Sequence, residues 1–196
     1  MMERNGNGAK DFGRNGVVVY MKKRELGEVS KKERSHRLSK LGRELLYYGL
    51  TELYGLEGEK EPIGKTPYGK PYLVHHPEIH YNISHSGSVA VCAFAPFPVG
   101  VDIQEKVPSA AEKIAGRFFS AEEVQEIQRS EDPERVFFQI WTREESFAKW
   151  DGRGLSHNLG SEKKTGYCFE FIPYEGYFGA VWTEKKVPVR FWRLGE

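Results

Sequence analysis

The segment WTREESFAKW, residues 141–150, places two adjacent carboxylates and one ammonium group among large aromatic side chains. Glu145 precedes Lys149 by four residues, the favoured order for an ordinary ion pair on a helix surface. On a helical wheel, however, Glu144 and Glu145 both fall within the arc of the apolar residues, and Lys149 lies at its edge. A carboxylate near a core is costly unless it is paired or bound to a metal. A surface ion pair and a carboxylate placed for chemistry therefore both remain open, and the wheel does not select one glutamate.

A second candidate acid is Asp102 in the segment VGVDIQE, residues 99–105. The alternation of β-branched residues predicts a strand that buries one face and presents Asp102 on the other. Gly100 would let a ligand or another chain approach the backbone. Gln104 shares the Asp102 face and offers a neutral amide oxygen to a metal or to its water, and oxygen ligands of this kind suit Mg²⁺ better than Zn²⁺. The alternative is a solvent-facing acid near a strand end, and the sequence alone does not bring Asp102 beside Glu145.

The segment YNISHSGS, residues 81–88, is rich in hydrogen-bond donors. Ser84, His85 and the backbone amides around Gly87 predict a turn that could hold a phosphate. A tight hairpin with a solvated histidine explains the same residues, so this segment alone does not decide between the two.

Basic residues elsewhere could supply charge-assisted hydrogen bonds to phosphates. They are Lys70 in YGKPY and the cluster from Lys31 to Arg37. The alternative for the cluster is the polar face of an amphipathic helix.

The overall composition limits the classes of partner. The 196 residues include 29 Lys and Arg against 28 Asp and Glu, which argues against bulk nucleic acid as the main partner. No run approaches the roughly 18 apolar residues of a membrane span, and the N-terminus lacks the apolar region of a secretory signal. Cys92 and Cys168 are isolated and have no metal-ligand spacing, as expected in a reducing cytosol. We therefore expect a cytoplasmic protein with neither a nucleic-acid nor a membrane partner.

The first part of the chain mixes a strand, a long helix and turns. The β-branched run VVVY, residues 17–20, predicts a strand. Leucines at three- and four-residue intervals predict a helix over residues 30–54, which Gly55 and Gly58 end. The segment IGKTPYGKPYL, residues 63–73, is turn-rich.

Further strands are expected in the middle and at the end of the chain. Residues 80–95 read as a hairpin with a turn at HSGS, followed by the strand at VGVDIQE. The closing strands are expected at YCFEFI, FGAVW and VPVRFW.

Two helices are marked by their capping residues. Ser120 and Glu123 form a capping box at the start of the first. Asp132 as N-cap and Pro133 at the first helical position begin the second, which runs through WTREESFAKW and stops at Gly152.

This order of elements predicts an α+β protein with two similar halves. We expect a flexible N-terminal tail over residues 1–16, an N-terminal half over 17–98 and a C-terminal half over 99–196. No compositional linker separates the halves, so they are expected to pack together.

The order of the motifs resembles a known family. GKPYL, YNISHSG, VGVDIQE, RFFSAEE and WTREESFAKWDGRGL are similar to successive signatures of the 4′-phosphopantetheinyl transferases of the surfactin-synthetase-activating, pseudodimeric subfamily. The similarity covers residues 35–156 and is weaker in the closing strands. Any one motif is a weak signal, whereas their order is a strong one.

The resemblance implies a fold and an activity. It implies two α+β halves related by a pseudo-two-fold axis, with the active site in the cleft between them and a monomer as the active form. The implied activity moves the phosphopantetheine arm of coenzyme A (CoA) onto a serine of an apo acyl or peptidyl carrier protein and releases adenosine 3′,5′-bisphosphate. The implied cofactor is Mg²⁺.

The resemblance also assigns roles to residues. Asp102 and Glu145 would hold Mg²⁺ against the pyrophosphate, with Gln104 at the third metal-side position. Lys149 would neutralise charge on the phosphoryl group or the leaving bisphosphate. Glu145 or a metal-bound water would accept the proton of the carrier serine.

The implied CoA-binding residues share the ability to contact phosphate oxygens. They are Lys31, Arg37, Lys70, Ser84, His85 and Lys149. Phosphoryl transfer depends mainly on alignment and on cations where charge accumulates, which agrees with such a set.

The sequence departs from the family pattern at two positions. Many relatives have an acid where this chain has Gln104, and the motif usually has lysine where this chain has Glu144. A glutamate at 144 is expected to reverse a charge next to the metal site. The N-terminal segment and the C-terminal end are also expected to be short for the subfamily, which would alter the surface that covers CoA or docks the carrier.

Two alternatives follow from these departures. The first is a catalytically weakened family member that binds CoA or a carrier protein without turnover. The second is a structural or interaction domain in which Glu145 and Lys149 form only an ion pair. The sequence identifies neither the carrier nor the pathway.

Overall fold

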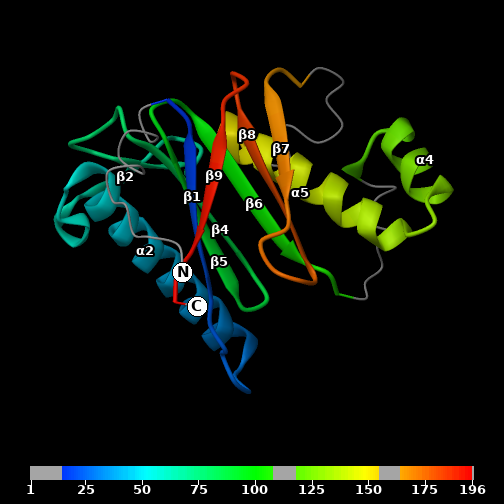
Figure 1. Ribbon diagram of the computed structural model, residues 1–196, viewed down its shortest axis with the longest axis horizontal. Coiled ribbons are helices and arrows are strands. Elements are labelled where there is room, and N and C mark those ends of the chain that lie inside the picture. Colours follow the sequence, from blue (N-terminus) through cyan, green and yellow to red (C-terminus); the bar gives the residue numbers. More distant parts are fainter. Residues whose placement is uncertain (1–14, 108–117, 155–163, 196) are drawn as a thin grey trace.

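Two β-sheets form the centre of the molecule, and a long helix lies on the outer side of each (Figure 1). The computed structural model describes residues 15–107, 118–154 and 164–195. The prediction of an α+β protein is confirmed. The similarity of the two halves and their division between residues 98 and 99 remain predictions, and residues 1–14 of the expected tail lie outside the described residues.

The first sheet has the strand order β4-β5-β1-β9. Its strands are β1 (Val17–Lys23), β4 (His80–Ser86), β5 (Val89–Ala95) and β9 (Val189–Arg193). β4 and β5 form the expected antiparallel hairpin, and β5 pairs antiparallel with β1. β9 pairs in parallel with β1, so a strand from the end of the chain completes the N-terminal sheet.

Helix α2 (Lys31–Gly49) covers one face of this sheet. Ser30 caps its N-terminus by accepting a hydrogen bond from the backbone N–H of Glu33. A π-helical turn, η1 (Leu50–Tyr54), continues the helix, and Gly55 ends it with a φ of 72°, as expected for a left-handed C-terminal residue. The leucines of α2 pack on the sheet residues that face them, including Val18, Ala90 and Phe94.

The turn-rich segment after α2 contains a small hairpin as well as turns. A 3₁₀ turn, η2 (Gly58–Lys60), precedes β2 (Ile63–Lys65) and β3 (Pro71–Leu73), which pair antiparallel. The sequence indicated the turn but not the two short strands, because glycine and proline residues recur through the whole segment of residues 63–73.

The second sheet has the order β6-β8-β7. It consists of β6 (Val99–Glu105), β7 (Tyr167–Phe171) and β8 (Tyr177–Thr183). Helix α4 (Ala121–Arg129) begins with the predicted capping box, and α5 (Pro133–Asp151) begins at the predicted Asp132 cap and ends at Gly152. α5 packs against β6 and β8.

The faces of the two sheets that the helices leave open share one hydrophobic core. Odd-numbered residues of β1, β5 and β6 meet there, because side chains alternate between the faces of a strand. The even-numbered residues of β6, among them Asp102 and Gln104, are therefore directed to the other side, where α5 lies.

β4 and β6 lie beside each other without a ladder of backbone hydrogen bonds. Side chains of β4 instead accept hydrogen bonds from backbone N–H groups of β6, and we call this set the seam. Its members are Val101 N to Asn82 Oδ1, Ile103 N to Ser84 Oγ and Glu105 N to Ser86 Oγ, at 2.9, 3.2 and 3.0 Å. Donors and acceptors both recur every second residue, so the seam fixes one register between the two sheets.

Within the described ranges, none of the helices is both long and apolar enough to cross a membrane.

Candidate active site

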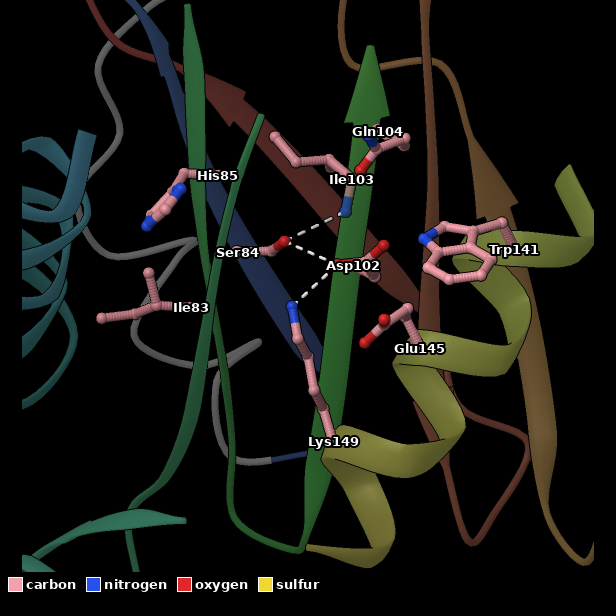
Figure 2. A pocket seen from close by; sticks show the side chains of 9 residues that line it. All are labelled: Ile83, Ser84, His85, Asp102, Ile103, Gln104, Trp141, Glu145 and Lys149. Carbon is pink, nitrogen blue, oxygen red and sulfur yellow. Dashed lines mark hydrogen bonds and ion pairs between the residues drawn. The ribbon is translucent and has the colours of Figure 1, made fainter. Parts of the chain in front are cut away.

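A cavity of about 240 Å³ lies between β4, β6 and α5. Figure 2 shows Asp102 and Gln104 on β6 facing Glu145 and Lys149 on α5. The residues that line the cavity are Ile83, Ser84, His85, Asp102, Ile103, Gln104, Trp141, Glu145 and Lys149. The fold thus brings together two acidic segments that the sequence alone did not connect.

Asp102 is the centre of the polar contacts in this cavity. It is 5% exposed, and its Oδ1 accepts two hydrogen bonds of 2.7 Å, one from Ser84 Oγ and one from Lys149 Nζ. Its other oxygen, Oδ2, is buried and has no hydrogen-bond partner among the described residues. A buried carboxylate oxygen without a partner is costly, so Oδ2 is suited to accept a ligand.

Glu145 is half-buried beside Asp102. Burial, and next the negative charge of Asp102, raise the pKa of Glu145 to about 7, against the opposite effect of the Lys149 ammonium. Within the described part of the chain, no ion pair joins Glu145 to Lys149, because the lysine ammonium pairs with Asp102 instead. The ordinary i, i+4 surface pair is therefore not formed.

The donor set fits Mg²⁺. Asp102 and Glu145 supply two carboxylates, Gln104 lies on the same wall and supplies an amide oxygen, and Asp102 Oδ2 is unpartnered. No group of three or more His, Cys, Asp or Glu residues is arranged for a metal in the ranges that the structure describes, in keeping with glutamine at position 104. A divalent cation would also offset the repulsion between the two carboxylates.

Gly100 has a structural role that differs from the expected one. A side chain at this position would collide with the backbone of Ser146 and Trp150. The close approach is therefore made by helix α5 of the same chain and not by a ligand or another chain. It brings α5 near enough to β6 for Glu145 to face Asp102.

Ser84 and His85 both lie in strand β4, and the turn follows at Gly87. The strand predicted up to Ser84 is therefore confirmed, whereas the turn predicted to include His85 and Ser86 was wrong, because the strand continues through Ser86, whose hydroxyl belongs to the seam. The hydroxyl proton of Ser84 is donated to Asp102. His85 Nε2 lies 3.4 Å from Ser39 Oγ of α2, and burial followed by the charge of Lys149 lowers the pKa of His85.

Lys70 lies in a second cavity that adjoins the first through Ile83, Glu145 and Lys149. Its ammonium donates a 2.7 Å hydrogen bond to the carbonyl of Trp150 in the last turn of α5. Burial lowers the pKa of Lys70 to about 8. Lys70 therefore borders the candidate site and also binds a C-terminal carbonyl of the helix that carries Glu145.

Lys31 and Arg37 lie on exposed turns of α2 and line neither cavity. Arg37 bonds to Glu33 Oε1 at 2.8 Å and to the carbonyl of Leu26 at 3.2 Å. Their proposed contact with CoA remains a prediction.

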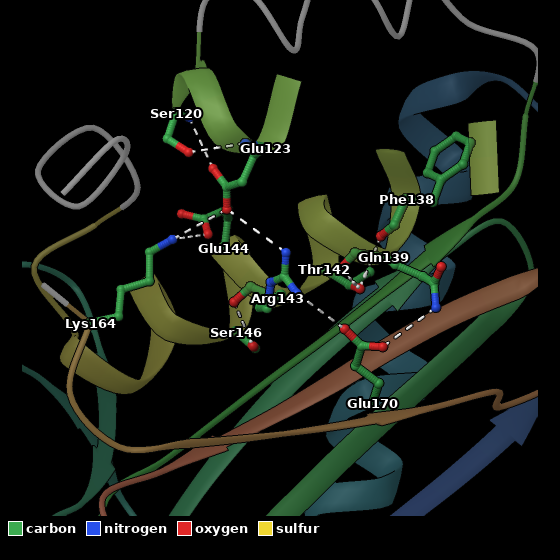
Figure 3. A network of polar contacts seen from close by, with 10 residues as sticks. All are labelled: Ser120, Glu123, Phe138, Gln139, Thr142, Arg143, Glu144, Ser146, Lys164 and Glu170. Atoms are coloured by element: carbon green, nitrogen blue, oxygen red, sulfur yellow. Dashed lines mark hydrogen bonds and ion pairs between the residues drawn. The ribbon is translucent and has the colours of Figure 1, made fainter. Parts of the chain in front are cut away.

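Glu144 does not lie next to the metal-side residues, contrary to expectation. It is 2% exposed and pairs with Lys164, which lies just before β7 (Figure 3). The carboxylate of Glu123 in the capping box lies 3.6 Å from the same lysine. Successive helical residues point about 100° apart, so Glu144 and Glu145 enter different environments. The expected charge reversal is thus balanced by Lys164, away from the Asp102 cavity.

Two further residues of the site were not identified from the sequence. Trp141 forms part of the cavity wall, and Ser39 contacts His85. The aromatic arc around Trp141 was visible in the helical pattern, whereas nothing in the sequence connected Ser39 to a strand 46 positions away.

Comparisons with known proteins identify relatives of this chain. Residues 98–174, which contain Asp102, Gln104, Glu145 and Lys149, match the model of the 4′-phosphopantetheinyl transferase superfamily. A 4′-phosphopantetheinyl transferase of Bacillus subtilis is 39% identical over 132 residues, or 66% of this chain and 58% of the relative. The 4′-phosphopantetheinyl transferase Sfp of Bacillus subtilis strain 168 is 38% identical over 132 residues, again 66% of this chain and 58% of the relative.

A more distant relative comes from Xenopus laevis, where an L-aminoadipate-semialdehyde dehydrogenase-phosphopantetheinyl transferase is 28% identical over 79% of this chain and 54% of the relative. The chain therefore spans a little over half the length of these three curated relatives.

Proposed function

The chain is a relative of the Sfp-type 4′-phosphopantetheinyl transferases, and on this basis we propose that it transfers the 4′-phosphopantetheine arm of CoA to a serine of an apo carrier protein. The reaction is Mg²⁺-dependent and releases adenosine 3′,5′-bisphosphate. The observation that carries this proposal is the convergence of Asp102, Glu145 and Lys149 in one cavity, with one buried oxygen of Asp102 left without a partner.

Asp102 and Glu145, with Gln104 as a neutral oxygen ligand, would hold a Mg²⁺ ion that neutralises charge on the pyrophosphate of CoA. Lys149 is proposed to stabilise the charge that develops on the transferred phosphoryl group or on the leaving bisphosphate. Its ammonium lies 2.7 Å from Asp102, so it is already directed into the cavity. His85 on the opposite wall is proposed to contact a CoA phosphate.

Glu145 is proposed to accept the proton of the carrier serine. In the metal-free protein, burial together with Asp102 raises the pKa of Glu145 to about 7; Mg²⁺ bound beside this carboxylate would lower that pKa, so Glu145 would be ionised and able to accept a proton. The cavity beside it, about 290 Å³ in volume and lined by Tyr68, Lys70 and Gly154 among others, adjoins Glu145 and is proposed as the approach of one of the two substrates.

We propose that the active form is a monomer, because both walls of the cavity come from one chain. β4 supplies Ser84 and His85, while β6 and α5 supply the remaining polar groups.

Intact mass spectrometry tests the proposed activity. The protein, CoA and Mg²⁺ are incubated with apo carrier proteins of the fatty-acid, polyketide and peptide-synthetase types. We expect at least one carrier to gain the mass of one phosphopantetheine group, and Asp102→Ala to abolish the gain. Absence of transfer to every carrier would refute the proposal, and calorimetric binding of CoA in that case would favour a binding module.

A further inference from the structure

Ser84 differs from the other members of the seam. Asn82, Ser84 and Ser86 each accept one hydrogen bond from a backbone N–H group of β6. Ser84 alone among these three also donates a hydrogen bond to Asp102, its Oγ lying 2.7 Å from Asp102 Oδ1. The middle seam contact therefore connects the register of the two sheets to an acid of the candidate site.

The hydroxyl of Ser84 has no donor capacity left for a ligand. A serine hydroxyl has one hydrogen to donate, and this one is directed at Asp102 while the oxygen accepts from Ile103 N. Ser84 is 5% exposed, so both contacts are protected from water. A second role as a phosphate donor would require it to give up the bond to Asp102.

We propose that Ser84 is a positioning residue: together with Lys149 it holds Oδ1 of Asp102, so that Oδ2 is presented for the cation. Figure 2 shows the contacts of Ser84 and Lys149 on one side of Asp102, and Glu145 and Trp141 on the other. This inference rests on the proposed function, since it concerns how the chain binds its divalent cation.

Lys149 alone is a weaker restraint on the carboxylate. It reaches Asp102 from another element through a long side chain that is 28% exposed, whereas Ser84 lies on the adjacent strand and is itself fixed by the seam. Without the serine hydroxyl, the carboxylate of Asp102 can rotate around its terminal bond and Oδ2 loses its fixed direction. Hydrogen bonds that orient a metal ligand typically change metal affinity by about 10-fold to 100-fold.

The test compares Ser84→Ala with Ser84→Thr and Ser86→Ala. Ser84→Ala removes the seam bond and the bond to Asp102, Ser84→Thr retains a hydroxyl, and Ser86→Ala removes a seam bond only. Mn²⁺ binding is followed by electron paramagnetic resonance with CoA present and carrier absent, and the Mg²⁺ concentration for half-maximal transfer is measured separately. Thermal unfolding reports the effect on the fold.

We expect Ser84→Ala to weaken Mn²⁺ binding and to raise the half-maximal Mg²⁺ concentration by about 10-fold, with CoA affinity changed less than about twofold. Ser84→Thr should restore most of the cation affinity. Ser86→Ala should leave it unchanged while the melting temperature falls about as much as in Ser84→Ala.

Three results would overturn the proposal. Unchanged Mn²⁺ binding in Ser84→Ala would show that the hydroxyl does not orient Asp102. Loss of CoA affinity with cation affinity intact would identify Ser84 as a phosphate ligand, and failure of Ser84→Ala alone to fold would identify a structural role. If the wild-type protein transfers nothing, the proposed function fails, whereas the Mn²⁺ measurement still tests the positioning role.

Discussion

Glu144 and Glu145 are neighbours in α5, yet their carboxylates lie in different environments: Glu144 pairs with a lysine, whereas Glu145 borders a cavity. Glu144 is almost completely buried and pairs with Lys164, and Lys164 also lies 3.6 Å from Glu123. Glu145 borders a cavity, and the nearby lysine of its own helix binds Asp102 instead. One carboxylate is thus satisfied within the fold, whereas the other is left available.

The pKa values follow the same division. Burial raises the pKa of Glu144, and the hydrogen bond and charge of Lys164 oppose that increase. Burial also raises the pKa of Glu145, but here the next contribution is repulsion from Asp102, and the result is about 7. Both pKa values are raised, and the difference lies in the second-largest contribution: the hydrogen bond of Lys164 lowers the pKa of Glu144, whereas the charge of Asp102 raises the pKa of Glu145.

The largest expected effect separates the two glutamates by activity. Glu145→Gln should lower the transfer rate by about 1000-fold or more, because it removes a proposed metal ligand and proton acceptor in one substitution. Glu144→Gln should retain transfer within about tenfold when assayed at a temperature where it is folded. Intact-mass assays of a carrier protein at saturating CoA measure both. Equal loss in the two variants would remove the distinction between the two sides of α5.

The second prediction separates the two glutamates by stability. Glu144→Gln should lower the free energy of unfolding by about 2–3 kcal/mol, less than the loss for a fully isolated buried pair because Glu123 still lies near Lys164. Glu144→Lys should be more destabilising, since it places two ammonium groups together. Urea unfolding followed by circular dichroism measures these changes.

The matched control is the reversed pair. Glu144→Lys combined with Lys164→Glu exchanges the two charges and should recover part of the lost stability. No recovery relative to Glu144→Lys alone would indicate that the contact at this position depends on shape and not on charge.

The third prediction concerns Glu145 in metal-free protein. Its pKa in the folded state, about 7, lies above the ordinary value of 4.5, so the folded protein binds more protons than the unfolded chain between these values. Stability from this group is therefore full below about pH 4.5 and is lost as pH rises through about 7. Glu145→Gln should be more stable than wild type by about 2–3 kcal/mol near pH 8, with no gain near pH 4, because a shift of about 2.5 pKa units corresponds to about 3.5 kcal/mol and partial exposure of this carboxylate to solvent reduces that figure.

Urea unfolding at several pH values with a chelator present measures this difference. Glu131→Gln, a substitution of an exposed glutamate outside the cavity, is the matched control for the loss of one carboxylate. A constant difference between Glu145→Gln and wild type across the pH range would mean that the carboxylate titrates normally.

The smallest expected effect concerns the third oxygen ligand. Gln104→Glu should increase Mg²⁺ affinity by roughly tenfold, because an anionic oxygen replaces a neutral one beside Asp102 and Glu145. The Mg²⁺ dependence of transfer measures it, with Gln104→Asn as a control that keeps the ligand neutral. An unchanged dependence would show that position 104 does not contact the cation.

Much of the fold was predictable because its signals are local. The capping box at Ser120, the Asp132 cap and the strand at residues 99–105 all appear where the pattern predicted them. These elements depend on neighbours within a few residues, and the spacing of their apolar side chains follows either the helical or the strand period. The alternation in β6 also correctly separated Asp102 from the core face.

The remaining features depend on contacts between distant segments. Ser84 and Ser86 of β4 accept hydrogen bonds from N–H groups of the distant strand β6, so their polar character suggested a turn at a position where the strand continues. The partner of Glu144 is Lys164, 20 positions away. A helical wheel reports direction but not what lies there, and it could not distinguish a paired carboxylate from an available one.

The parallel pairing of β9 with β1 has a consequence for how the chain acquires its structure. Val17 pairs with Val189, so nearly the whole described chain separates the two partners. Closing so long a loop is entropically costly and is expected to occur late in folding. During synthesis, the edge of β1 that pairs with β9 would stay unpaired until β9 has been synthesised. An unpaired apolar strand edge favours aggregation. The first sheet is therefore expected to be completed only after the segments that carry Asp102 and Glu145 have left the ribosome.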